Sequence, residues 1–276
     1  MTKTWFITGT SKGFGRVWAE AALRRGDQVV ATARNLESLQ ELNEHYGDNV
    51  LTLALDVTNK AAVDIVVRQA YEHFGRLDVI INNAGYGQFG AIEEISEQEA
   101  RDQLETNLLG ALWVTQAALP YLREQGSGHI IQVSSIGGVS TVPYIGMYHA
   151  SKWGLEGFSQ ALNQEMQALG IKVTLIEPIG YTTDWAGPSA KFAQELPVYD
   201  HVREANSARL SASVRGNPEA TGPVVLKLVD MEHPPLRIFF GKGAHDRIHV
   251  EYEKRLAEWD AFKDLSEEAH GEESVM

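Results

Sequence analysis

The sequence predicts an α/β fold in which a doubly wound, seven-stranded and mainly parallel sheet carries helices on both faces. Three observations predict it. Short apolar runs alternate with helical patterns, a glycine-rich turn follows the first run, and 276 residues are enough for one large domain with a substantial buried core. We therefore expect residues 1–276 to form a single domain.

The predicted strands are short apolar runs bounded by turn residues: Trp5–Thr8, Gln28–Ala33, Val50–Leu55, Leu77–Ile81, His129–Ser134, Ile171–Ile176 and Leu236–Phe240. Segments with helical periodicity separate most of them: Arg16–Arg25, Leu36–Tyr46, Lys60–Phe74, Glu97–Arg123, Tyr148–Leu169, Glu219–Met231 and Asp246–Phe262. This alternation indicates parallel pairing with helical crossovers. Ligands of such sheets bind beyond the carboxyl ends of the strands, so the residues after each strand are the site candidates.

Two segments fall outside this alternation. The stretch of about residues 181–217 contains no confident strand and follows the sixth one, so we expect a substrate lid there. The end of the chain, about residues 246–276, is rich in acidic residues and is expected to form a solvated helix and tail.

Composition limits the classes of partner. The net charge of −13 argues against a nucleic-acid or anionic-membrane binder. The absence of cysteine excludes disulfides and thiolate chemistry. No apolar stretch approaches the roughly 20 residues that span a bilayer, and no signal-peptide pattern opens the chain, so we expect a cytoplasmic protein. His149 and His201 lack a third partner at ligand spacing, so we predict no metal site.

A glycine-rich turn connects the first predicted strand to the first predicted helix. Its glycines lack a Cβ atom, so backbone N–H groups and the positive end of the helix dipole can approach a pyrophosphate closely. This context is typical of the dinucleotide-binding turn of Rossmann-type folds. The expected cofactor-binding residues of the turn are Gly9, Thr10, Ser11, Lys12, Gly13, Phe14 and Gly15.

Tyr148 and Lys152 form a candidate proton-transfer dyad. They are four residues apart in a helical segment, so they share a face and the ammonium can lie near the phenol oxygen. A neighbouring cation favours the phenolate, so we expect the Tyr148 pKa to lie below its reference value of about 10. Tyr148 would be the general acid in ketone reduction and the base in the reverse direction.

Together, and in this order, the motifs resemble the classical short-chain dehydrogenase/reductase family from Thr8 to at least Thr183. The matching residues are the cofactor loop Thr8–Gly15, the strand-stabilising motif Asn82–Gly85 and the catalytic positions Asn107, Ser135, Tyr148 and Lys152. The resemblance implies one dinucleotide-binding and catalytic domain that transfers hydride between nicotinamide and a carbonyl compound or secondary alcohol.

The resemblance also implies roles for single residues. Ser135 precedes Tyr148 by the family's thirteen residues, so it, and not Ser134, is expected to hydrogen-bond the substrate oxygen. Strand alternation points Ser134 to the opposite face. Asn107 would hold a water molecule that links Lys152 to solvent. The alternative is a helix-interior asparagine that merely bends its helix.

The end of the second predicted strand decides the expected cofactor. An NAD enzyme usually presents an acidic side chain there, whereas this chain has Ala33 and Arg34. Arg34 can hold a 2′-phosphate bidentately and Lys12 adds a second cation, so NADP(H) is favoured over NAD(H). The alternative is that both are ordinary surface charges.

Further cofactor contacts are implied by the resemblance alone. Asp56 would lie beside the adenine, or it is a turn or cap residue near Thr58. Ile179 replaces the family's glycine, and because a β-branched residue resists positive φ, Gly180 would take the strain. Thr183 is a candidate for the nicotinamide carboxamide or an ordinary loop residue. The other expected contacts are Val57, Asn83, Ala84, Gly85 and Pro178.

Aromatic and other large side chains are predicted near the carboxyl edge of the sheet: Tyr86, Phe89, Tyr144, Met147, Trp185, Phe192 and Tyr199. They predict an apolar wall and a bulky hydrophobic carbonyl or alcohol substrate, although each could instead pack the lid onto the domain. We expect an NADP-dependent carbonyl reductase or alcohol dehydrogenase. The alternatives are an epimerase or dehydratase using the same site and a catalytically silent NADP-binding regulator. The resemblance implies a homodimer or homotetramer.

Overall fold

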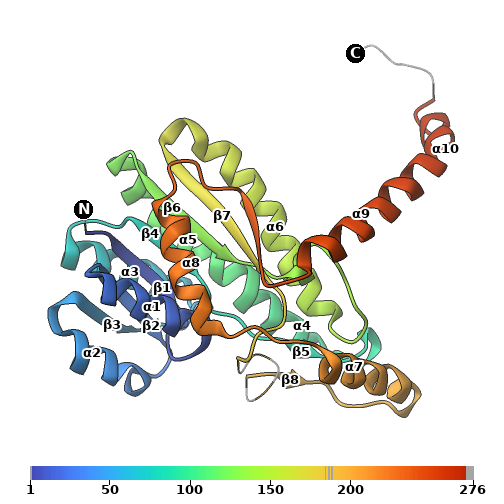
Figure 1. The fold of residues 1–276 in the computed structure, drawn as a ribbon, viewed down its shortest axis with the longest axis horizontal. Helices are drawn as coiled ribbons and strands as arrows, with labels where there is room; N and C mark the ends of the chain where they lie inside the picture. Colours follow the sequence, from blue (N-terminus) through green and yellow to red (C-terminus); the bar gives the residue numbers. More distant parts are fainter. Residues whose placement is uncertain (1, 184, 186, 188, 272–276) are drawn as a thin grey trace. The chain divides into compact units, whose positions relative to one another are not determined.

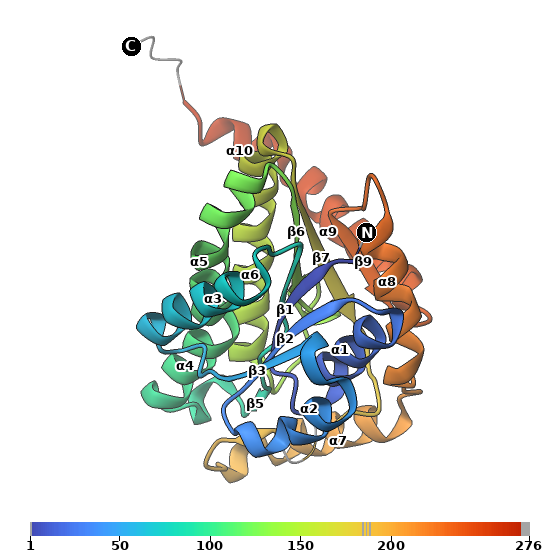
Figure 2. The ribbon, with the colours of Figure 1, turned by 90° about the vertical axis from the view of Figure 1, so that its left-hand side faces the viewer.

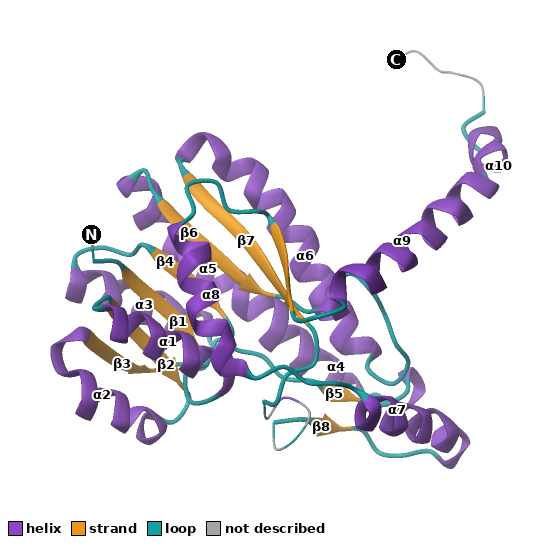
Figure 3. Ribbon diagram, viewed as in Figure 1, coloured by secondary structure: helices purple, strands orange, loops and turns teal. Residues whose placement is uncertain are grey.

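The computed structural model describes residues 2–271 except 184, 186 and 188, and in this part of the chain strands and helices alternate (Figures 1 and 3). One sheet contains seven strands: β1 Thr4–Thr8, β2 Gln28–Ala33, β3 Val50–Ala54, β4 Val79–Asn82, β6 Gly128–Val133, β7 Ile171–Pro178 and β9 Arg237–Phe240. Their order is β3-β2-β1-β4-β6-β7-β9, and every pair of neighbours is parallel. The predicted doubly wound fold is confirmed.

Both faces of the sheet are covered, as the strand pattern requires. On β1, Trp5 and Ile7 pack into one apolar cluster and Phe6 into the other, because successive side chains of a strand point to opposite faces. The first cluster contains residues of the helices α1 Gly13–Arg25, α2 Gln40–Tyr46 and α8 Gly222–Asp230. The second contains residues of α3 Lys60–Phe74, α5 Gly110–Gln125 and α6 Gly146–Met166 (Figure 2).

Most predicted helices are found with shifted ends. The segment predicted as one helix from Leu36 begins as the 3₁₀ turn η1, where the Asn35 side chain accepts a hydrogen bond from the Glu37 N–H group at 3.0 Å, and continues as α2. The short 3₁₀ segments are η1 Leu36–Leu39, η2 Gly47–Asn49, η3 Ile92–Glu94, η5 Ile136–Gly138, η6 Gln167–Leu169, η8 Pro197–Tyr199 and η9 Pro218–Thr221.

The helix predicted over Glu97–Arg123 is interrupted. It consists of α4 Glu97–Leu104, the π-helical turn η4 Glu105–Leu109 and α5. A single π turn inside a helix leaves no mark on apolar periodicity over this length, and such turns occur frequently at functional sites. Asn107 lies in the middle of it.

The predicted lid contains more regular structure than the sequence indicated. Within it, α7 Asp200–Ala212 is helical and β8 Lys191–Phe192 pairs in parallel with β5 Gln88–Phe89 in a second, two-stranded sheet. Tyr181 and Gly216 form a bridge that joins the two ends of the segment. Residues 184, 186 and 188 lie outside the described residues, and the role of the segment as a lid stays a prediction.

The chain divides into two compact units, Met1–Gly241 and Lys242–Met276. The second contains α9 Ala244–Ala261, close to the predicted bounds, and α10 Lys263–Glu268, while the last five residues of the predicted tail lie outside the described part. The expectation of a single domain over all 276 residues stays a prediction. Of the helices that the structure describes, none is both long and apolar enough to cross a membrane.

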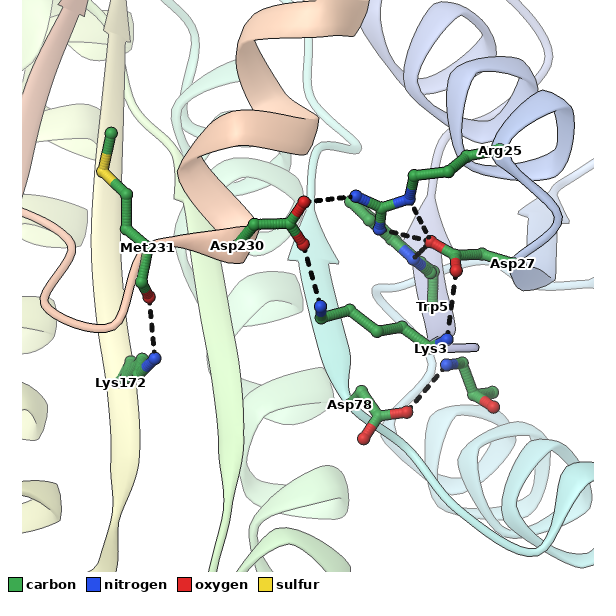
Figure 4. Close-up of polar contacts among 9 residues, drawn as sticks. Lys3, Trp5, Arg25, Asp27, Asp78, Lys172, Asp230 and Met231 are labelled. Carbon is green, nitrogen blue, oxygen red and sulfur yellow. Dashed lines mark hydrogen bonds and ion pairs between the residues drawn. The ribbon is translucent and has the colours of Figure 1, made fainter. Parts of the chain in front are cut away.

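A network of charges closes the amino ends of the central strands (Figure 4). Asp27 accepts hydrogen bonds from the Lys3 backbone N–H group at 3.1 Å, from Trp5 Nε1 at 2.9 Å and from the Arg25 guanidinium. Asp230 bridges Lys3 Nζ at 2.8 Å and Arg25 at 2.9 Å. The network therefore ties β1, α1 and the end of α8 together.

Candidate active site

The glycine turn between β1 and α1 has the shape that the sequence predicts. Gly9 and Gly13 have positive φ angles of 70° and 60°, which residues with a Cβ rarely adopt. A Cβ on Gly15 would overlap the Gly9 carbonyl and lie 2.5 Å from Asn83 Nδ2. Thr10 closes the turn with hydrogen bonds from its N–H and hydroxyl groups to the Thr32 carbonyl, at 3.0 and 3.1 Å.

The start of α1 is suited to an anion. The N-cap residue Lys12 makes no side-chain cap hydrogen bond, and the first turn contains no acidic residue. The backbone N–H groups of that turn can therefore donate hydrogen bonds to a ligand, and the helix dipole adds positive potential. These features fit the pyrophosphate of a dinucleotide.

The motif after β4 holds the glycine turn in place. Asn83 Nδ2 donates to the carbonyl oxygens of Thr8 and Gly9 at 2.9 and 3.0 Å, and the N–H groups of Asn83 and Ala84 donate to Thr8 Oγ1 at 3.0 Å. The backbone-satisfying role expected of this motif is therefore present. A Cβ on Gly85 would lie 3.0 Å from Asn107 Oδ1, so the same motif reaches the second half of the site.

The ends of β2 and β3 carry the residues expected at the adenosine. Arg34 is exposed, and it forms no ion pair with any residue in the described part of the chain. Asp56 accepts hydrogen bonds from the N–H group and hydroxyl of Thr58 at 3.0 and 2.8 Å. This is the geometry of a turn residue, one of the two roles predicted for Asp56. Val57 is buried against Gly110 at the start of α5.

Three of the predicted catalytic side chains meet between β6 and the first turns of α6. Lys152 Nζ donates to the Val133 carbonyl at 2.7 Å and lies 5.8 Å from the Tyr148 ring centroid. Ser135 is the N-cap residue of η5, and its hydroxyl accepts a hydrogen bond from the Gly137 N–H group at 3.0 Å. Ser134 points elsewhere: its hydroxyl lies beside Gly138 and has no hydrogen-bond partner among the described residues.

The pKa of Tyr148 moves in the direction opposite to the expectation. Burial raises the pKa of Tyr148 to about 12, and a hydrogen bond with Ser135 opposes the rise. Burial lowers the pKa of Lys152 to about 8, and the carboxylate of Glu156 opposes the fall. The sequence argument counted the charge of Lys152 but not the removal of both groups from water, which disfavours each charged form.

Asn107 is held by the π turn against the loop after β4. Its Oδ1 accepts from the Tyr86 N–H group at 3.1 Å, and its Nδ2 donates to the Tyr86 carbonyl at 3.0 Å and to Ser151 Oγ at 3.2 Å. The side chain is buried and fully engaged with the loop. Asn107 thus fixes Tyr86 at the edge of the site, and its role in proton relay stays a prediction.

The segment after β7 differs from the expected turn. Ile179 and Gly180 both have negative φ, and the Ile179 N–H group donates to the Phe240 carbonyl at 3.0 Å, so the β7–β9 pairing continues through this position. The positive φ lies instead at Gly241, at 118°, where a Cβ would collide with the Ile179 side chain. The prediction that Gly180 would take the strain is therefore wrong. The glycine with a positive φ is Gly241, which follows the neighbouring strand β9.

Pro178 ends β7, and Thr183 follows close to the glycine turn. The methyl group of Thr183 lies 3.9 Å from where a Cβ on Gly13 would stand. The structure therefore brings the last predicted cofactor residue next to the first group of them, from a segment 170 residues away in the sequence.

Aromatic side chains form one wall beside Tyr148. Its ring lies 4.8 Å from that of Trp185, and Phe89 packs 5.6 Å from Trp185 and 6.2 Å from Tyr144. Tyr144 is buried with a φ of 76°, the one positive value at a non-glycine residue in the described chain. Such strain persists only where the surrounding structure enforces it, and it often marks functional sites.

Some of the other residues predicted for the wall are buried or half-buried, and others are exposed on the surface. Phe192 stacks on Phe89 at 5.1 Å but is exposed. Tyr199 donates to Glu93 at 2.6 Å on the surface. The Tyr86 hydroxyl is buried without a hydrogen-bond partner among the described residues, and burial raises its pKa to about 12. Met147 is half-buried beside Tyr148.

The sequence analysis missed an ion pair that joins the predicted lid to this wall. Arg203 of α7 donates to the buried carboxylate of Glu94, whose other contacts are the N–H groups of Ala91 at 2.7 Å and Leu196 at 2.8 Å. Nothing in the local sequence pattern identifies a pair separated by 109 residues.

Comparisons with known proteins agree with the fold. The short chain dehydrogenase family model matches residues 3–193, and the chain belongs to this family. It is 43% identical over 266 residues to an oxidoreductase, BOA17, of Botryotinia fuckeliana, with 94% of each chain covered. It is 35% identical over 244 residues to a 3-ketodihydrosphingosine reductase of Bacteroides thetaiotaomicron, with 85% of this chain and 86% of the relative covered.

Two solved structures show the same relationship. A short-chain dehydrogenase from Streptomyces avermitilis superimposes with a TM-score of 0.91 at 36% identity, covering 97% of this chain and 98% of the other. An alcohol dehydrogenase from Thermococcus sibiricus, in complex with 5-hydroxy-NADP, superimposes with a TM-score of 0.73 at 25% identity, covering 87% and 96%. The protein is accordingly an oxidoreductase of alcohol and carbonyl groups.

Proposed function

We propose that the protein is an NADP-dependent carbonyl reductase for a bulky apolar ketone. The observation that carries the proposal is the meeting of Ser135, Tyr148 and Lys152 at the carboxyl edge of the sheet, beside an aromatic wall and with Lys152 close to Gly85. Bound NADPH would supply the hydride. The remaining chemistry is derived from the side chains of this chain.

Tyr148 acts as the general acid. Its pKa of about 12 keeps the phenol protonated at neutral pH, so the proton is available for a carbonyl oxygen that gains negative charge. Ser135 hydrogen-bonds the same oxygen and holds it at the phenol. Hydride addition to the carbonyl carbon and proton transfer from Tyr148 together convert the ketone to an alcohol, and Lys152 stabilises the phenolate that remains.

Arg34 supports the choice of NADP over NAD. The side chain is exposed at the end of β2 without an ion-pair partner in the described chain, and no carboxylate stands at the position where an NAD enzyme presents one. A guanidinium binds a phosphate bidentately. The Thermococcus sibiricus relative, bound to a modified NADP, agrees with this choice.

The aromatic wall supports the substrate class. Phe89, Tyr144 and Trp185 present apolar surface next to Tyr148, and Arg203, the cation that acts on Tyr144, is paired with Glu94. A substrate carboxylate or phosphate would find no free charge on this wall. The relative that reduces a 3-ketosphingoid base fits the same class, and we propose a ketone on a long or bulky hydrocarbon.

NADPH and NADH consumption with a panel of long-chain 3-ketones, aryl ketones and quinones tests the proposal. We expect turnover with NADPH that falls by about 10³-fold in Tyr148→Phe, because the phenol proton is lost while the ring remains. Tyr46→Phe, which alters a tyrosine at the end of α2, is the matched control and keeps full activity. Cofactor binding without turnover on any compound would contradict the reductase assignment and favour a silent binding protein. Cytoplasmic location and oligomeric state stay predictions.

A further inference from the structure

Two buried carboxyl groups, one of them a single helical turn from Lys152, belong to none of the roles described above. Glu156 follows Lys152 by one turn of α6, and Glu177 is the penultimate residue of β7. Glu156 is 5% exposed and Glu177 is fully buried. Isolated carboxylates are rarely buried to this extent because their desolvation costs several kcal/mol.

Arg237, at the start of β9, balances one of the two charges. Its Nε donates to Glu156 Oε2 at 2.8 Å but lies 3.6 Å from Glu177 Oε1. Its NH2 group donates to Gln160 Oε1 at 2.9 Å. Neither oxygen of Glu177 accepts a hydrogen bond from any described residue, and the same holds for Glu156 Oε1. The guanidinium therefore satisfies Glu156 and leaves Glu177 without a donor.

A proton on Glu177 resolves this arrangement. Two adjacent carboxylates in a low-dielectric site cannot both be ionised, whereas a protonated carboxyl group supplies the missing donor. Glu156 receives the short contact of Arg237, so it is the ionised member. In agreement, burial and the charge of Glu156 raise the pKa of Glu177 to about 8, while Arg237 opposes the rise.

Glu156 links this pair to the catalytic residues of α6 and to the turn after β6. Glu156 lies on the same face of α6 as Lys152 and Tyr148, at spacings of four and eight residues. A Cβ on Gly138 would lie 2.6 Å from Ser134 Oγ and 3.3 Å from Glu156 Oε1, so the Glu156 carboxylate also reaches the turn η5 that Ser135 caps.

We propose that Glu156 and Glu177 share one proton and that this carboxyl pair sets the charge of Lys152. The inference rests on the proposed function, in which Lys152 supports Tyr148, and it makes the two glutamates positioning residues. With one shared proton the pair carries one negative charge, which Arg237 balances. Loss of that proton adds a second negative charge, which favours the Lys152 ammonium at the pH where burial would neutralise it.

The charged and titratable groups around the pair are few. Lys152 and His149 come from α6 and Arg237 comes from β9, while the segment between β6 and η5 contributes Ser134 among the described residues. His149 is engaged with the backbone of Gly137 and Val142, at 2.8 and 2.9 Å. The titration of the pair is therefore expected to act on Lys152.

The shared proton can be tested without turnover. Infrared spectra of the full chain at pH 7 are expected to show the C=O stretching band of a buried carboxylic acid, which fades as the pH passes about 8 and is absent in Glu177→Gln. Glu165→Gln, which alters an exposed glutamate at the end of the same helix, is the matched control and keeps the band. Absence of the band in the wild-type protein would overturn the proposal.

Thermal unfolding supplies a second readout. Because the folded-state pKa of Glu177 is raised above its unfolded value, the stability that this group contributes is present at low pH and is lost as the pH rises from about 4.5 to about 8. Glu177→Gln has no such titration, so its unfolding temperature should rise relative to that of the wild-type protein as the pH increases across this window. An unchanged difference between the two proteins would contradict the shared proton.

The link to Lys152 is tested by the pH profile of kcat/KM for ketone reduction. We expect Glu156→Gln to move the alkaline limb to lower pH by about one unit, because it removes the negative charge nearest to the ammonium. Glu177→Gln should lower kcat/KM by about tenfold at pH 9 and by less at pH 7. The variant lacks only the negative charge that Glu177 acquires when it loses its proton at high pH. Glu165→Gln should retain the wild-type profile.

The outcomes separate the two proposals. Unchanged alkaline limbs in both folded variants would show that the pair is merely structural and would overturn its role toward Lys152. If the wild-type protein shows the carboxylic-acid band but reduces no ketone, the reductase assignment fails together with the role toward Lys152, and the shared proton stands.

Discussion

Buried polar groups at the two ends of the central sheet differ in how fully they are hydrogen-bonded. At the amino ends, Asp27 is 4% exposed and receives donors from Lys3, Trp5 and Arg25 (Figure 4). At the carboxyl ends, the hydroxyl of Ser134 and both oxygens of Glu177 have no hydrogen-bond partner among the described residues.

The difference separates stability from function. A buried charge that is fully paired holds elements together and has no capacity left for a ligand. A buried polar group without a partner costs about 1–3 kcal/mol, so it persists where binding or chemistry uses it. The pairing at the amino end therefore joins β1, α1 and α8, and the unpaired groups lie at the end of the sheet where we propose that the reaction takes place.

The largest effect is expected for Lys152→Met. We expect kcat/KM for ketone reduction to fall by about 10³-fold, because the phenolate of Tyr148 loses its cation. The unfolding temperature should change little or rise, because a buried amine is replaced by an apolar chain of similar length. Steady-state kinetics and thermal unfolding measure the two effects. A large loss of stability would contradict the contrast between the two ends.

Asp27→Asn should give the opposite pattern. The variant leaves donors of Trp5 and Arg25 without a carboxylate, and we expect it to lower the free energy of unfolding by about 3 kcal/mol. Asp230→Asn is the control at the exposed side of the same network, and it should cost less than about 1 kcal/mol. Denaturant titration measures both. A marked fall in kcat for the folded Asp27→Asn protein would break the division of roles.

Arg34→Ala tests the cofactor half of the carboxyl end. A bidentate phosphate contact contributes about 1.5–3 kcal/mol, so kcat/KM for NADPH should fall by about 10- to 100-fold while the value for NADH stays the same. Arg68→Ala, an exposed arginine on α3, is the control. Equal losses with both cofactors would remove the assignment of Arg34 to the 2′-phosphate.

His129 at the start of β6 is an exception at the amino end and gives the smallest predicted effect. It is buried, its Nε2 contacts Thr174 Oγ1 at 2.9 Å, and its Nδ1 has no partner among the described residues. Burial, with a smaller contribution from Lys172, lowers its pKa to about 3. The unfolded chain therefore binds the proton more tightly, and the stability present above about pH 6.5 is lost as the pH falls toward 3.

At pH 5.5 this loss amounts to roughly 1.4 kcal/mol relative to neutral pH. His129→Gln should remove that slope while keeping a hydrogen bond to Thr174. Unfolding curves between pH 5 and 7 for the two proteins measure the effect. An identical slope in the variant would place the acid sensitivity elsewhere.

Several features of the site could be predicted because they are local in sequence. The glycine turn, the motif after β4 and the Tyr148–Lys152 spacing each depend on a few consecutive residues and on the strand or helix that carries them. The strand runs were found within one or two residues at most ends because apolar runs of this kind form buried parallel strands.

Other features depended on distant residues. The π turn at Asn107 and the helix α7 left no clear periodic signal. The conformation of Ile179 was decided by Gly241 on the neighbouring strand. The direction of the Tyr148 pKa was decided by burial, which a spacing argument does not contain.

The sequence alone was enough for the fold class and the glycine turn, and it indicated Tyr148 and Lys152 as candidate proton-transfer residues, because each depends on local pattern and side-chain chemistry. The tertiary structure alone decided which buried charges are paired. Glu177 and Arg237 come from separate strands, 21 and 81 residues after Glu156, and only folding brings them beside it. Desolvation and pairing depend on that meeting in space, and they fix the charge available to the reaction.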